Sequence, residues 1–212
     1  YSCFLVGALA LAAVPPFSGF YSKDAIIEAV HLSSIPGAHY AYFCLLLGAF
    51  VTSYYIFRAF FLTFHGEERF DDSVDRSQIK EYRVMLFPLI ALAIPSAILG
   101  IFIVKPMLFS TPTWLSSSVT ALPAHDVLSI MRDKFHGLWS MTWHSVMTGP
   151  FWLSLLGILF AYRGTLYKTN WGAMWKKSFP MLYYILKKNY GFDAFNHWVI
   201  VRPITAMSRF FY

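Results

Sequence analysis

Charged side chains are scarce in this sequence. Asp, Glu, Lys and Arg together make up 13% of its 212 residues, whereas an ordinary soluble domain carries about 25%. Hydrophobic residues reach 57% of the chain. A surface with so little charge is poorly suited to water. The composition therefore excludes a typical soluble domain and indicates a protein whose solvent is lipid.

Charge is also absent from long stretches of the chain. Four stretches run for 17 or more residues without Asp, Glu, Lys or Arg: 1–22, 41–57, 84–104 and 145–162. A helix of about 20 apolar residues crosses the roughly 30 Å of hydrocarbon in a bilayer. We therefore predict an all-α, polytopic transmembrane protein with about four spans. The first is a broken helix, and the predicted bounds are about 2–32, 39–64, 84–105 and 145–164.

Cysteine is nearly missing. Cys3 and Cys44 both lie in apolar stretches, where a free thiol behaves as a small hydrophobic side chain. This placement speaks against a disulfide or a metal-binding pair. The connection at 111–144 carries His125, His136 and His144 without cysteine partners, which is a poor zinc pattern. We predict no metal, haem or nucleotide site, and we expect the tryptophans of this connection to lie at the headgroup level.

A positively charged leader is absent too. The chain opens on Tyr1, with no methionine and no basic residues ahead of its first apolar stretch. That stretch is therefore not predicted to be a signal peptide. We expect that the chain begins inside a larger protein or is one product of a split one.

Basic residues gather on alternate connections. The connections after the second and fourth predicted spans are rich in Lys and Arg, whereas 31–40 has none and 107–144 has only Arg132 and Lys134. By the positive-inside rule the rich connections face the cytoplasm or the mitochondrial matrix. An even number of spans places both chain ends on that side, in a bacterial plasma membrane or a mitochondrial inner membrane. The formal charge of +6 follows from this bias, so no nucleic acid partner is predicted.

The sequence changes character near residue 165. Residues 166–212 are aromatic and basic, are interrupted by Pro180 and Pro203, and carry charge too often for a deep span. Amphipathic segments with Trp and Lys lie along a membrane interface. We predict two parts: 1–165 holds the transmembrane helices, and 166–212 is an interfacial segment that leads into a lateral amphipathic helix. A short span from Trp198 onward is the alternative, which Arg202 and Arg209 disfavour.

A helix break interrupts the first apolar stretch. Pro15, Pro16 and Gly19 precede its resumption at Ser22. Consecutive prolines remove two backbone donors and a glycine frees the chain, so the helix should break there. Ser18 or Ser22 could cap the second half. A broken helix within a membrane is costly unless it lines a hydrated or protein-buried cavity.

Charged residues follow this break directly, beginning with Lys23 and Asp24. Two interpretations of Lys23 stay open. On a straight helix it lies about 30 Å from Ser2 and would be a solvated lysine at the far surface. If the break lies near mid-depth, Lys23 is a proton-pathway residue, because a lysine held away from water releases its proton more readily. Glu28 and His31 could extend such a pathway, or Glu28 could pair with Lys23 or face water.

Three motifs carry a resemblance to a known family. The run PPFSGFYSKDAIIEA resembles the broken-helix segment of the antiporter-like subunits of respiratory NADH:quinone oxidoreductase, or complex I. TSYYIFRAFFLTFHGEER resembles the next helix of the distal, L-type subunit, called subunit 5 in mitochondria, and NYGFDAFNHWVIVRP resembles the approach to its lateral helix. Gly191 and Ala194 depart from the family pattern there. In this order the motifs resemble the C-terminal portion of that subunit.

The resemblance implies a proton-translocating membrane-arm subunit of this enzyme. It implies that Lys23 serves the exit side of a half-channel and that Asp24 is functionally important. This chain would hold no cofactor, since flavin, iron–sulfur clusters and quinone are expected in other subunits. Expected partners are the other membrane-arm subunits, including the adjacent antiporter-like one, the N-terminal part of the same subunit, and lipid. The family's other key groups lie upstream, so this chain alone is not expected to pump.

Two alternatives belong to other classes. A subunit of a multisubunit Na⁺/H⁺ antiporter shares the broken helix, but the tail that contains Val201, Arg202 and Pro203 disfavours it. A structural or assembly fragment would use its tail to clamp neighbouring subunits. Lys23 would then be a solvated cap with no proton path of its own.

Overall fold

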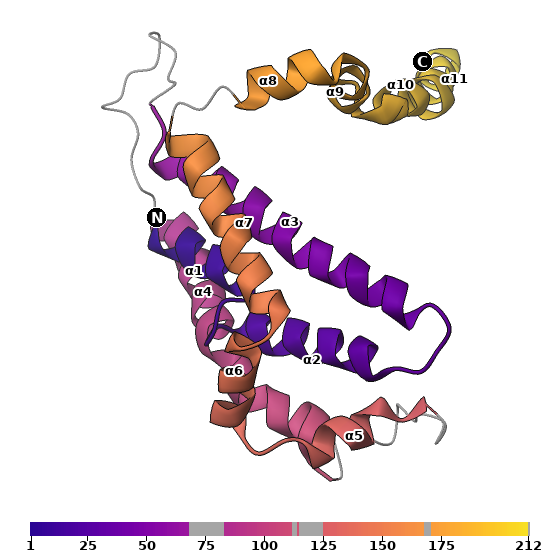
Figure 1. The fold of residues 1–212 in the computed structure, drawn as a ribbon. Helices are drawn as coiled ribbons and strands as arrows, with labels where there is room; N and C mark the ends of the chain where they lie inside the picture. The colour runs from indigo at the N-terminus through magenta and orange to yellow at the C-terminus, as the bar shows by residue number, and fades with distance from the viewer. Residues whose placement is uncertain (68–82, 112–113, 115–124, 168–170, 212) are drawn as a thin grey trace. The chain divides into compact units, whose positions relative to one another are not determined.

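The described part of the chain is mainly helical. A computed structural model describes residues 1–67, 83–111, 114, 125–167 and 171–211, and these residues include no strand. They form two compact units, Tyr1–Tyr167 and Lys168–Tyr212 (Figure 1). The predicted all-α class is confirmed, while the roles assigned to two parts of the chain stay a prediction.

The first unit is built from seven α-helices within its described residues and one short π-helix that extends the fourth. In chain order they are α1 (Ser2–Leu11), α2 (Ser18–Leu32), α3 (Ala38–Phe64), α4 (Arg83–Val104), the π-helix η2 (Lys105–Phe109), α5 (Val127–Asp133), α6 (Leu138–Val146) and α7 (Gly149–Leu166).

Two of these helices are long and apolar enough to cross a membrane unaided. They are α3 and the continuous helix of α4 and η2. The pair α6 and α7, bent by 61°, makes a third if it counts as one span. The first predicted span is present as two helices, of which α1 is apolar but only 10 residues long. By length and composition the described residues thus contain two candidate spans, or three with the bent pair, where about four spans were predicted.

Prolines shape α4 without ending it. Pro88 and Pro95 lie inside the helix, as tolerated in membrane helices, where neighbouring groups can satisfy the freed carbonyls. The predicted end at residue 105 is short by four residues, because the chain continues as a π-helix to Phe109. Pro106 lies in the first turn of this π-helical segment, and proline has no N–H to donate to the preceding turn of α4.

Small side chains bring α3 and α7 together. The buried small residues at their contact are Ala49 and Ser53 on α3, and Ser154, Gly157 and Ala161 on α7. A Cβ atom at Gly157 would lie 2.5 Å from the Phe50 carbonyl oxygen, so only glycine permits this approach. Membrane helices commonly associate through such small residues because their backbones can then pack closely.

Two separate apolar clusters hold the halves of the broken helix. One joins α1 to α3 and α7 through Ala8, Ala12, Phe57, Phe60 and Ala161. The other joins α2 to the end of α4, η2 and α5 through Phe20, Tyr21, Ala25, Val104, Phe109 and Met131. The break therefore connects two differently packed elements.

The connections between the predicted spans have two different outcomes. The segment 111–144 was expected to be a long connection, but it contains α5 and most of α6. Phe109 and Phe135 stack there with ring centroids 4.1 Å apart, which draws this segment onto the end of η2. The connection after the second predicted span, which is rich in Lys and Arg, lies outside the described residues from 68 to 82.

The second unit is a chain of short helices. They are α8 (Trp171–Ser178), α9 (Pro180–Lys187), the 3-10 turn η4 (Asn189–Gly191), α10 (Phe192–Asn196), the π-helix η5 (His197–Val201) and α11 (Arg202–Phe211). No side chain described in this unit is buried. Gly191 has a φ of +80°, a left-handed conformation that favours glycine and accounts for its presence there.

Candidate functional site

The break between α1 and α2 covers residues 12–17 and contains both predicted prolines, Pro15 and Pro16. Gly19 lies instead in the first turn of α2, which corrects the prediction that it loosens the break. A Cβ atom at Gly19 would overlap the carbonyl oxygen of Ala10. Glycine is needed here because the start of α2 passes directly against the backbone of α1.

Lys23 is bound to the end of α1. Its Nζ donates a hydrogen bond of 2.6 Å to the carbonyl oxygen of Leu11, the last residue of that helix. In a continuous helix this oxygen would accept from the N–H four residues later, but that residue is Pro15, which has none. The lysine side chain therefore satisfies a carbonyl that the break sets free. A cation also suits the C-terminal end of a helix dipole.

Ser18 fastens the start of α2 to α4. Its hydroxyl donates to the Pro95 carbonyl at 2.7 Å and accepts from the Gly100 N–H at 2.8 Å. A Cβ atom at Gly100 would lie 2.6 Å from the Ser18 Cα, so glycine allows the approach. The prediction that Ser18 or Ser22 caps α2 is wrong, because the N-cap residue is Phe17 and no side chain caps it.

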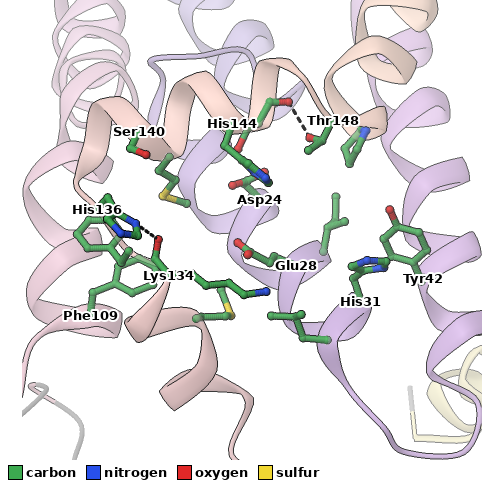
Figure 2. Close-up of a pocket in the computed structure, with 17 residues that line it drawn as sticks. Asp24, Glu28, His31, Tyr42, Phe109, Lys134, His136, Ser140, His144 and Thr148 are labelled. Carbon is green, nitrogen blue, oxygen red and sulfur yellow. Dashed lines mark hydrogen bonds between the residues drawn. The ribbon is translucent and has the colours of Figure 1, made fainter.

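A cavity of about 600 Å³, lined by both apolar and ionisable side chains, lies beside α2. Asp24, Glu28 and His31 line it from one face of α2, as their spacing of four and three residues requires. The opposite wall comes from the α5–α6 segment, and Figure 2 shows side chains from both walls converging on the same space. The polar residues of that opposite wall are Lys134, His136, Ser140, His144 and Ser145.

Asp24 lies where two cavities meet. Besides the large cavity it lines a smaller one of about 20 Å³, together with Lys23, Ser145 and Ser154. That volume is sufficient for about one water molecule. The Asp24 carboxylate interacts with the Ser145 hydroxyl, and Glu28 and His144 are close enough to act on its charge. Asp24 is thus the group shared by the lysine at the break and the larger cavity.

Exposure increases along the cavity. Ser145 is buried and Asp24 and Glu28 are half-buried, whereas His31, at the outer end of α2, is exposed. The His31 ring lies 4.8 Å from the Tyr42 ring at the start of α3. Of the four predicted polar residues, Asp24, Glu28 and His31 therefore line the large cavity, and Lys23 lines only the small one, which it shares with Asp24.

Sequence reasoning missed Lys134, His136 and His144 as part of this site. The only signal was that Lys134 and Arg132 are the two basic residues of an otherwise basic-poor connection. Among the described residues no group of three or more His, Cys, Asp or Glu side chains is placed to hold a metal ion. Cys3 and Cys44 are both free.

Comparisons with known proteins identify the relatives of this chain. No family model matches it. It is 34% identical to NADH-quinone oxidoreductase subunit L of Neisseria meningitidis serogroup B, over 98% of this chain and 33% of the relative. NADH-ubiquinone oxidoreductase chain 5 of Chondrus crispus is 32% identical over 96% of this chain and 30% of the relative. NAD(P)H-quinone oxidoreductase chain 5 of Picosynechococcus is 28% identical over 97% of this chain and 32% of the relative.

These relatives and the apolar helices together support a membrane location. The chain spans about a third of the length of the curated relatives it matches. The resemblance predicted from the motifs is confirmed: over nearly its whole length this chain is homologous to part of the L-type, or chain 5, subunits of NADH:quinone oxidoreductases.

Proposed function

We propose that this chain forms the exit-side part of a proton half-channel in the membrane arm of an NADH:quinone oxidoreductase. Lys23 and Asp24 are the groups that carry the proton. One observation carries the proposal: Lys23 is bound to the carbonyl freed by the helix break, and the adjacent Asp24 opens onto a cavity that other ionisable side chains also line. A broken helix beside a cavity with ionisable groups is what a proton path through a bilayer requires.

The transfer step between these two residues is chemically simple. The Lys23 ammonium loses a proton and becomes a neutral amine, and the Asp24 carboxylate gains that proton and becomes a carboxylic acid. The small cavity lined by both residues has room for one bridging water. Lys23 retains N–H donors in both states, so its bond to the Leu11 carbonyl can persist through the cycle.

The redox chemistry belongs to other subunits in this proposal. Flavin, iron–sulfur clusters and quinone reside there, and this chain has no cofactor of its own. Its partners are the adjacent antiporter-like subunit, other membrane-arm subunits, the N-terminal part of an L-type subunit, and lipid. Both chain ends face the matrix or cytoplasm, and α11 lies along the membrane interface because its apolar and polar residues occupy opposite faces.

Proton pumping by the complete assembly tests this function. Lys23→Ala is compared with Lys177→Ala, a matched removal of an exposed lysine in the second unit that lines neither cavity. We expect Lys23→Ala to lower the number of protons pumped per electron while electron transfer is retained, and Lys177→Ala to leave it unchanged.

Two results would contradict the proposal. Equal pumping by the two variants would mean that Lys23 only stabilises the helix break through its hydrogen bond to the Leu11 carbonyl. Exchange of Na⁺ for protons without any electron donor would instead favour the antiporter class.

A further inference from the structure

We infer that His144 is the proton-release group of this path: it takes the proton from Asp24 and passes it out of the cavity. The inference rests on the proposed function and adds a residue from a segment that the sequence patterns did not connect with the site. His144 lies 120 positions after Asp24 in the chain, and the fold alone brings the two together.

The position of His144 suits an exchange between the cavity and its surroundings. Figure 2 shows the His144 ring beside the Asp24 carboxylate, and the two are close enough for their charges to interact. His144 is exposed, whereas its neighbour Ser145 is buried and holds Asp24 from the same wall. The imidazole therefore lies beside Asp24, at an exposed edge of the cavity.

Acidic and basic groups surround His144. It lies in the last turn of α6, and the C-terminal end of a helix dipole interacts favourably with a transient cation. Asp24 and Glu28 face it across the cavity from α2. Lys134, whose side chain extends toward Glu28 in Figure 2, lines the same space, as do His31 and His136. In the inferred relay the two carboxylates attract the imidazolium while it exists, and the positive charge of Lys134 favours release of its proton.

The release step conserves atoms and charge. The Asp24 carboxylic acid gives its proton to the unprotonated ring nitrogen of neutral His144, which yields a carboxylate and an imidazolium. The imidazolium then gives a proton to solvent and returns to its neutral form. Asp24 is again a carboxylate, ready to accept the next proton from Lys23. Histidine suits this role because its unperturbed pKa lies near neutrality.

The test uses the complete assembly with His144→Gln, and the matched control is His125→Gln. His125 is also exposed and lies 19 positions earlier, but it does not line the cavity. The loss of pumping in Lys23→Ala measures how much of the pumping depends on this path. We expect His144→Gln to lose most of that pumping and His125→Gln to lose none. Electron transfer is measured in parallel for all variants.

Rescue by imidazole separates a relay from a structural role. His144→Ala leaves space beside a cavity of about 600 Å³, so added imidazole can occupy the site of the missing ring. We expect imidazole to restore pumping in His144→Ala but not in Lys23→Ala.

Each other outcome has one meaning. Normal pumping by Lys23→Ala would refute the proposed function itself. Loss of pumping in Lys23→Ala with normal pumping in His144→Gln would overturn only the role of His144. Loss in His144→Gln without any rescue of His144→Ala by imidazole would make His144 a structural residue and would overturn the inference as well.

Discussion

At the scale of single residues, Pro15 and Lys23 compensate for one another. Pro15 stands where a helix would supply an N–H to the Leu11 carbonyl, and Lys23 supplies that donor from the following helix. A backbone carbonyl left without a donor away from water costs about 1–3 kcal/mol. The lysine thus has a structural role in addition to its proposed part in proton transfer, which is why pumping must be compared with electron transfer in the same preparation.

Ser18→Ala is expected to destabilise the first unit, because the hydroxyl serves both the Pro95 carbonyl and the Gly100 N–H. Loss of both bonds should cost about 1–3 kcal/mol. The control is Ser22→Ala, which removes only a local 3.2 Å bond to the Gly19 carbonyl. Thermal unfolding of the purified assembly in detergent compares the two, and equal midpoints would refute the importance of this contact.

Sequence alone could identify Pro15, Pro16, Lys23 and Asp24, because prolines within an apolar run and charges beside it stand out in any membrane helix. The role of Gly19 was misassigned. A glycine that frees the backbone and one that admits a neighbouring backbone look identical in a sequence, and only the position of Ala10 distinguishes them.

At the scale of helices, close packing of small residues holds α7 along α3 (Figure 1). This contact fixes the start of α7, where Thr148 and Pro150 line the large cavity. The distance between the two helices therefore influences the dimensions of the proposed release path.

Gly157→Leu should disrupt this pairing, since even a Cβ atom would meet Phe50 and Ser53 at 2.5 and 3.0 Å. Overpacking of this kind costs about 1–3 kcal/mol. Gly48→Leu is the matched control, because Gly48 lies within α3 and a Cβ atom there has no neighbour within 4 Å. Detergent-resistant assembly and thermal stability report the difference, and tolerance of both substitutions would contradict the packing.

The long apolar helices were predictable, but α5 and α6 were not. They are 7 and 9 residues long, too short for periodicity to distinguish them from a loop, and tertiary packing decides most of the stability of such short helices. Met131 and the Phe109–Phe135 stack supply that packing. Half of the cavity wall therefore depends on contacts that a local sequence pattern does not contain.

At the scale of the whole molecule, much apolar surface is left uncovered by the chain itself. Only 6% of the apolar window of the α4–η2 helix is buried, and no described side chain of the second unit is buried. Exposed apolar surface of this extent marks a protein or membrane interaction site. Each compact unit must be completed by lipid or by other subunits.

Met207→Asp is expected to weaken retention of the chain in the assembled membrane complex. Met207 is exposed on the apolar face of α11, and the loss of one buried apolar side chain should cost about 1.5–3 kcal/mol. Thr205→Asp places the same charge on the polar face of the same helix. Co-purification with the complex after a mild detergent wash measures retention. Equal loss in both variants would contradict the expectation that lipid or another subunit covers the apolar face of α11.

The hydrogen bond between Lys23 and Leu11 has a consequence for genetics. The acceptor is a main-chain oxygen, and every substitution at position 11 retains it. A mutational scan would thus find a sensitive lysine without a sensitive partner, and residue covariation would not reveal the pair. Replacing the amide between Leu11 and Ala12 by an ester, whose carbonyl is a weaker acceptor, would reach this contact while leaving both side chains in place.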